Sequence, residues 1–226
     1  MKRFYKEVEV DAQRAILLDR RPVKTPARAA LILPTDALAE AVAAEWRAQG
    51  EEVDPRAMPL TGLSNAAIDR VMPDPAAFAR PLAAYAETDL LCYRAEAPAE
   101  LVARQAKAWD PLLAWARARF DVHFAVTSGI VHAPQPAATG ARLGEALLAR
   151  DAFSLAAMSP LITIGGSLVT ALALAEGEIA AETAFDVTHL DELWQAERWG
   201  EDALALEARA ARRRDFMAAA GLLALL

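Results

Sequence analysis

The segment from Ala152 to Ala175 contains no charged residue, and this feature limits what the chain can fold into more than any other. An uncharged run of this length raises the question of a transmembrane helix. Pro160 interrupts the run, and a proline removes a helical hydrogen-bond donor and clashes with the preceding turn. We therefore predict two shorter helices, separated at Pro160, that are buried in a helical bundle without stable insertion into a membrane.

The composition is that of a globular protein with a substantial core. Of the 226 residues, 55% are hydrophobic and 24% are charged. The formal net charge is -7, which argues against a nucleic-acid ligand because neutralising phosphates requires clustered Lys and Arg. The one basic run, Arg212–Arg214, is expected to be a solvated helix face.

The single cysteine, Cys92, excludes a disulfide framework or a thiolate metal cluster within one chain and fits a reducing compartment. The first residues show neither the apolar core of a signal peptide nor the pattern of a transit peptide. We expect a bacterial cytoplasmic protein, or a mitochondrial matrix protein if the chain is a mature eukaryotic form.

The first third of the chain mixes strands and one helix. Strand character is found at 4–10, 15–18 and 31–33, with Asp11 to Gln13 as a hairpin link. Thr35 is the expected N-cap of a helix that Gly50 closes. Strands followed by a covering helix predict a small two-layer α/β domain.

After Pro59 the pattern is helix after helix, rich in Ala and Leu. Helices are predicted at 60–71, 75–87, 98–109, 111–120, 138–149, 151–158, 160–176, 181–199 and 202–224. A short extended pair is expected between residues 122 and 131. The fold class is therefore α+β. We expect an α/β N-terminal domain at 1–75, followed by a larger orthogonal helical bundle at 76–226.

A search for catalytic chemistry finds little. There is no phosphate-binding loop and no dinucleotide fingerprint, and Gly165-Gly166 is expected to allow close helix packing. No catalytic, cofactor-binding or metal-binding residue is predicted, and the chain is not expected to be an enzyme. Two alternatives stay open: a cryptic site that pairs Cys92 with His123 or His132 in an interdomain groove, and a carrier for an apolar ligand that uses the uncharged segment.

One predicted helix carries two different stripes. Leu190, Leu193 and Trp194 form an ordinary core face. Glu192, Gln195 and Trp199 form a second stripe that combines an acid, an amide and a large aromatic, residue types that anchor protein interfaces. The alternative is that Trp199 packs beneath the turn at Gly200 while Glu192 faces water.

Several short motifs occur together in an order that resembles one known family. They lie at 21–26 (RPVKTP), 45–50 (EWRAQG), 58–61 (MPLT), 85–91 (YAETDLL) and 194–200 (WQAERWG). This set is similar to the assembly chaperones for the alpha subunit of F-type ATP synthase, found in mitochondria and alphaproteobacteria. Two positions depart from the family pattern: Gly62 replaces a basic residue, and Arg21 replaces a glycine.

The resemblance implies a function as well as a fold. It implies a chaperone that holds the unassembled alpha subunit and is released by exchange with the beta subunit, without nucleotide hydrolysis. We also expect the chaperone to be monomeric when free and to carry no cofactor. It also implies that the partner-binding residues include Glu192, Gln195, Trp199, Trp46 and Asp89. For Trp46, the spacing from Leu38 and Val42 favours a core position.

Overall fold

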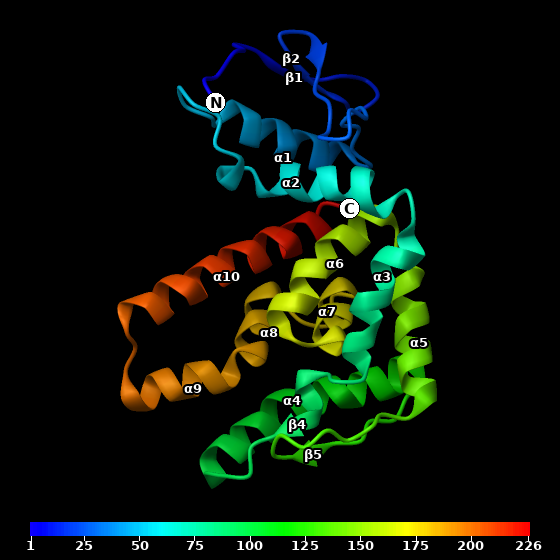
Figure 1. The fold of residues 1–226 in the computed structure, drawn as a ribbon, viewed down its shortest axis with the longest axis vertical. Coiled ribbons are helices and arrows are strands. Elements are labelled where there is room, and N and C mark those ends of the chain that lie inside the picture. The colour runs from blue at the N-terminus through cyan, green and yellow to red at the C-terminus, as the bar shows by residue number, and fades with distance from the viewer. The chain divides into compact units, whose positions relative to one another are not determined.

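The computed structural model describes residues 1–226, and they form an α+β protein dominated by helices (Figure 1). The chain divides into two compact units, each of which is described by itself. The first contains Met1–Phe78, Asp151–Ala157 and Ala218–Leu226, and the second contains Ala79–Arg150 and Met158–Met217. The predicted fold class is confirmed. That 1–75 and 76–226 fold as separate domains stays a prediction.

The first unit is built on a small antiparallel sheet of three strands. These are β1 (Val8–Val10), β2 (Ile16–Leu18) and β3 (Arg21–Pro22), in the order β1-β2-β3. The expected link at Asp11 is present, and its carboxylate accepts hydrogen bonds from two following backbone amides. Asp19 and Arg20 join β2 to β3 with φ of 48° and 64°, the left-handed backbone of a tight hairpin turn. The residues expected to form a strand at 31–33 make only an isolated bridge through Ile32.

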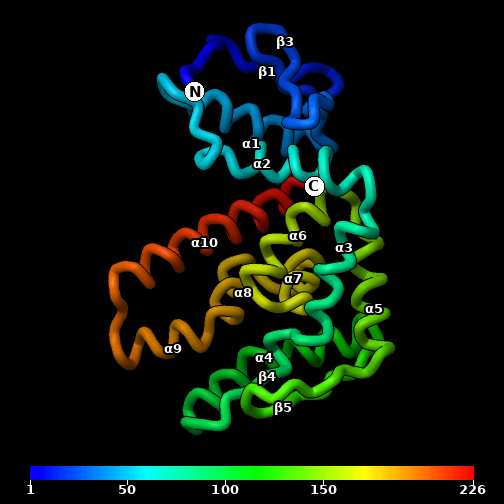
Figure 2. The backbone as a smooth tube through the Cα atoms, viewed as in Figure 1, coloured from blue at the N-terminus to red at the C-terminus, as the bar shows by residue number.

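Helices α1 (Asp36–Arg47) and α2 (Pro59–Ala66), together with the short turns η1 (Pro55–Ala57) and η2 (Ala67–Val71), complete this unit. Thr35 caps α1 as predicted, because its Oγ1 accepts a hydrogen bond from the amide of Leu38. The same hydroxyl donates to the carbonyl of Leu225, which holds the C-terminal residues in this unit. Figure 2 traces the path of the backbone from the N-terminus to the C-terminus. Glu45 of α1 caps α2 by accepting the backbone amides of Leu60 and Thr61.

The second unit is helical. Its elements are η3 (Ala84–Ala86), η4 (Leu90–Cys92), β4 (Tyr93–Arg94), α4 (Ala99–Phe120), β5 (Thr127–Ser128), α5 (Ala137–Leu148), α7 (Leu168–Ala175), α8 (Ala181–Thr188) and α9 (Leu190–Trp199). Three helices, α3 (Pro75–Ala83), α6 (Ala152–Gly165) and α10 (Ala203–Leu223), have residues in both units. The expected extended pair within 122–131 is wrong: β5 pairs instead with β4, in parallel.

Helix α4 contradicts the prediction of two helices separated at Pro111. It continues through this proline, which lies on the exposed side of the helix. The buried positions recur at helical spacing on both sides of it and include Trp109, Leu112 and Leu113. Packing of this continuous apolar stripe outweighs the one hydrogen bond that the proline removes.

The uncharged segment forms two buried helices, but the break lies elsewhere than predicted. Helix α6 continues through Pro160 and ends at Gly165, after which Gly166 adopts a φ of 65° and Ser167 caps α7. Gly165 allows the expected close packing, because a Cβ there would lie 3.1 Å from Cγ2 of Thr188. No helix combines the length and the hydropathy needed to cross a lipid bilayer.

Replacing Pro111 with alanine is expected to raise the free energy of unfolding by about 1–3 kcal/mol. The new amide can donate to the carbonyl of Lys107, and the exposed side chain loses no core contact. Urea unfolding followed by circular dichroism measures the change, and Ala114→Pro in the same helix should act in the opposite direction. A lower or unchanged stability of Pro111→Ala would contradict the account of α4 given above.

Candidate polypeptide-binding site

Helix α9 and the following turn carry several exposed large side chains of the second unit. The helix starts after His189 and ends at Gly200, whose φ of 79° lies in the region that favours glycine. Asp202 then starts α10 by accepting the amide of Ala205 at 2.8 Å. The predicted helix at 181–199 is therefore two helices, α8 and α9, divided at His189.

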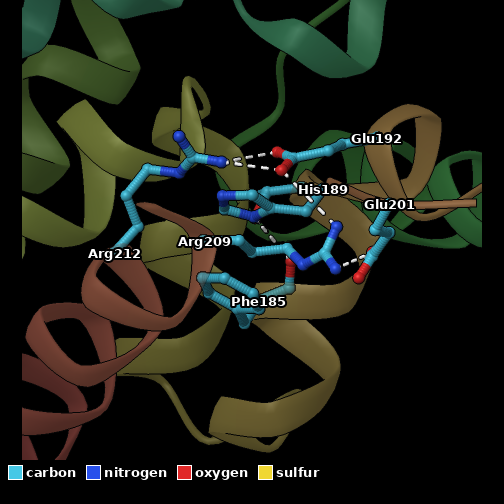
Figure 3. A network of polar contacts seen from close by, with 7 residues as sticks. Phe185, His189, Glu192, Glu201, Arg209 and Arg212 are labelled. Carbon is cyan, nitrogen blue, oxygen red and sulfur yellow. Dashed lines mark hydrogen bonds and ion pairs between the residues drawn. The ribbon is translucent and has the colours of Figure 1, made fainter. Parts of the chain in front are cut away.

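Glu192 projects from α9 into a cluster of charges (Figure 3). Its two carboxylate oxygens accept hydrogen bonds from Nη2 of Arg212 at 2.6 and 2.9 Å, and Nη1 of Arg209 lies 3.5 Å away. Arg209 also pairs with Glu201 in the turn. The Glu192 side chain is 36% exposed, so the carboxylate is held in place by α10 while one side of it still faces water.

His189 lies beneath this cluster and does not contribute a charge. Its ring stacks on that of Phe185, with centroids 3.9 Å apart, and its Nδ1 lies 3.0 Å from the Phe185 carbonyl oxygen (Figure 3). Burial lowers the pKa of His189, so the imidazole is neutral at neutral pH. The charge of the site is therefore set by the two glutamates and the two arginines.

The other two members of the predicted stripe face water. Gln195 is exposed, and Trp199 is 74% exposed although one edge of its ring contacts Trp194 at a centroid distance of 5.4 Å. Leu204 and Leu206, at the start of α10, are also exposed. The structure thus brings Glu192, Gln195 and Trp199 onto one helix and leaves the indole available for a contact.

A hollow of about 420 Å³ opens beside Glu192. Its wall combines the α6–α7 junction, the α8–α9 junction and Arg212 of α10. Apolar surface from Leu90 and Trp109 alternates there with the hydroxyl groups of Thr163 and Thr188. Such a mixed lining suits an amphipathic side chain of a bound polypeptide.

The arginines of this site face water and also form specific contacts. The run Arg212–Arg214 was expected to be a solvated face, and the side chains of Arg212 and Arg213 are 41% and 43% exposed. In addition, Arg212 pairs with Glu192, and Arg213 lies over the ring of Phe185 and pairs with Asp186. Arg214 is exposed as well. Arg209, one turn earlier, was not singled out, although its spacing of three from Arg212 places both on one face of α10.

Asp89, the fourth candidate, is completely buried and has no surface with which to contact a partner. Its Oδ1 accepts the amide of Leu91 at 3.1 Å, and its Oδ2 accepts the amide of Val169 at 2.9 Å. The carboxylate therefore caps η4 and the first turn of α7 at once. Burial raises its pKa to about 6 in spite of these hydrogen bonds.

Trp46, the fifth candidate, belongs to the first unit. It is half-buried against Tyr5, whose ring lies edge-on to the indole at 5.7 Å and whose hydroxyl donates to the Trp46 carbonyl at 2.7 Å. The core position expected from its spacing is thus partly correct, since one side of the indole also lines an open hollow.

The residues considered for catalysis are not arranged for it. Cys92 is fully buried, and burial together with the nearby charge of Asp89 raises the pKa of its thiol to about 12. His132 bonds instead to the hydroxyl of Tyr93 and to Glu87, at 3.0 and 3.3 Å. No group of three or more metal-ligating side chains is present in the chain.

Comparison with known proteins identifies the class of protein to which this fold belongs. The model of the ATP12 chaperone protein family matches residues 2–117. Protein atp12, mitochondrial, from Schizosaccharomyces pombe is 27% identical over 219 residues, which cover 89% of this chain and 75% of that protein.

Solved structures agree over the whole chain. The crystal structure of Atp12 from Paracoccus denitrificans has a TM-score of 0.92 and 40% identity, covering 99% of this chain and 97% of that one. The Atu1473 protein from Agrobacterium tumefaciens has a TM-score of 0.93 and 42% identity, covering 99% and 85% respectively. The protein is thus a chaperone and not an enzyme. It belongs to the ATP12 family, which acts in the assembly of ATP synthase.

The pKa of Asp89 predicts how stability depends on pH. A folded-state pKa of about 6, above the ordinary value of 3.8, means that the folded protein binds this proton more tightly than the unfolded chain. The stabilisation is complete below pH 3.8 and is lost as the pH rises through 6. Relative to Asp89→Asn, which does not titrate, the wild-type protein should lose up to about 3 kcal/mol between pH 4 and pH 7.5.

Urea unfolding of the wild type and of Asp89→Asn at several pH values tests this prediction. Asp215→Asn, which changes an exposed carboxylate of α10, should follow the wild type at every pH. Parallel stability curves for the wild type and Asp89→Asn would show that the carboxylate stays ionised in the folded state.

Proposed function

We propose that this protein holds the unassembled alpha subunit of F-type ATP synthase through the α9 face, defined here as Glu192, Gln195 and Trp199, until the beta subunit replaces it. The family membership supports the partner. The choice of surface rests on Trp199, a large aromatic residue that is 74% exposed and lies on the same helix as Glu192, whose carboxylate α10 holds in position.

The chemistry of the α9 face suits protein recognition. Burying a tryptophan removes a large apolar area from water, and such residues dominate interface energies. Glu192 supplies an orienting charge, since a cationic side chain of the partner can share it with Arg212. The balance of two glutamates and two arginines gives the cluster little net charge. Specificity thus comes from geometry more than from long-range attraction.

Release by exchange needs no energy source in the chaperone. An unassembled ring subunit exposes an apolar interface that invites aggregation. A chaperone that covers such a surface through a few side chains binds more weakly than the neighbouring subunit, which buries the whole interface. Competition alone then removes it, in agreement with the lack of a phosphate-binding loop in the sequence.

A carrier for an apolar ligand has no comparable support. The uncharged segment that suggested it forms α6 and α7, whose apolar side chains are used in the core. Those that are almost completely buried include Leu155, Leu161, Leu168 and Leu172.

Glu192→Lys is expected to weaken binding of the free alpha subunit by roughly tenfold or more, because it places a third cation beside Arg209 and Arg212 and repels a cationic partner. Isothermal titration calorimetry with purified alpha subunit measures the affinity. Glu178→Lys, a charge reversal at an exposed acid, serves as the matched control and should bind like the wild type. A Glu192→Lys variant whose melting temperature falls by more than a few degrees would assign the residue a structural role instead.

Trp199→Ala is expected to reduce the affinity roughly 30-fold, which corresponds to about 2 kcal/mol. The melting temperature should hardly change, because most of the indole already lies in water. Ile130→Ala, at an apolar residue that is 99% exposed, is the control for loss of exposed apolar surface. Equal losses of affinity in both variants would argue against a specific contact by Trp199.

The release step is tested with the preformed complex. Adding purified beta subunit, with nucleotide omitted, should transfer the alpha subunit and free the chaperone, as size-exclusion chromatography would show. Retention of the chaperone until ATP is added would refute release by exchange alone.

A further inference from the structure

The first unit contains a hollow of its own, with a volume of about 440 Å³. Its floor is apolar and is formed by Tyr5 and Leu18, both buried, with the indole of Trp46 beside them. Phe4 stands at the edge, 64% exposed, and its ring contacts that of Tyr5 edge-on at 5.4 Å. A concave aromatic surface of this size accommodates one or two side chains of a ligand.

The register of the sheet places a cation at the rim of this hollow. Val8 of β1 pairs with Leu18 of β2, which pairs with Arg21 of β3. Residues paired across neighbouring strands project to the same face of a sheet, so Arg21 lies on the face that carries the apolar floor. Lys24, three residues later, lines the same hollow.

These two cations form no salt bridge, although the positive charge of Arg21 acts on the nearby carboxylate of Asp19. Neither Arg21 nor Lys24 forms an ion pair, although the chain as a whole carries a formal net charge of -7. Asp19 is the only acid that lines the hollow, and its carboxylate is already engaged by the backbone amides of Lys6 and Glu7, at 3.0 and 2.9 Å. The site thus combines an apolar floor with two cations at its edge, which outnumber the one acid that lines it.

We propose that this hollow, formed by Phe4, Tyr5, Leu18, Arg21, Lys24 and Trp46, binds an extended segment of the client polypeptide that carries an aromatic or aliphatic side chain next to an acidic one. The apolar side chain packs on Tyr5 and Trp46. The carboxylate bonds to the guanidinium of Arg21, which matches its planar geometry, and to Lys24. Only the identity of the polypeptide rests on the function proposed above, because the complementarity holds for any peptide of this chemistry.

A fluorescein-labelled peptide of sequence Asp-Leu-Phe-Glu-Asp tests the chemistry directly, with Lys-Leu-Phe-Lys-Lys as its charge-reversed counterpart. Fluorescence anisotropy with the full chain should show binding of the acidic peptide alone. The double variant Arg21→Glu/Lys24→Glu should weaken that binding roughly tenfold or more. Arg56→Glu/Arg80→Glu, at two exposed cations that do not line the hollow, should bind like the wild type.

The position of the peptide is checked by NMR. The indole N–H resonance of Trp46, assigned by its loss in Trp46→Phe, should shift on addition of the acidic peptide and stay in place with the basic one. Absence of binding by the acidic peptide, or binding that the Arg21/Lys24 double variant does not reduce, would overturn the proposal. The cations would then only protect the edge of β3 against pairing with other strands.

The same variants separate this proposal from the one concerning α9. If the Arg21/Lys24 double variant binds free alpha subunit normally while Trp199→Ala does not, the hollow does not hold the client and the α9 face does. If the acidic peptide binds at Trp46 but the wild-type chain does not bind the alpha subunit, the hollow stands as a peptide site and the function proposed above fails.

Discussion

The buried carboxylate of Asp89 is the interaction on which the helical unit depends. Its oxygens cap two elements whose partner residues, Leu91 and Val169, are far apart in the sequence. A carboxylate removed from water is costly unless it is hydrogen-bonded, so the arrangement is favourable only when η4 and α7 are both in place. The carbonyl of Gly166 adds a further bond, by accepting the amide of Leu90. With the start of α7 held in this way, α4, α5 and α8 pack around it.

Helix α9 differs from α7 in how few of its side chains are buried. Only Trp194 of this helix is buried, so α9 contributes less to the core than α7, in which six of eight residues are buried. Two residues that precede Trp199 in the sequence form ion pairs, Glu197 with Arg104 and Arg198 with Glu100. Charged side chains of this kind keep protein surfaces soluble, so the indole of Trp199 can face water without promoting self-association. A helix held this lightly suits a surface that must be given up to another subunit.

Local signals were sufficient where the interaction is local. The N-cap at Thr35, the hairpin link at Asp11 and the candidate stripe on α9 were all visible in the sequence, because caps, turns and helical faces depend on residues a few positions apart. The same reasoning failed at Pro111 and Pro160. Both prolines lie within helices, because the buried stripes on either side of them pack against the rest of the unit. Local propensity could not foresee that packing.

The sequence by itself determined the α+β class and, through its ordered motifs, the family. Only the tertiary structure decided what the motif residues do. Asp89 caps two elements inside the core, and Trp46 lines a hollow. Glu192 lies at the centre of a cluster with arginines from α10. Each of these outcomes depends on groups brought together from distant positions. Burial and ion pairing are properties of the folded neighbourhood, which no short sequence pattern contains.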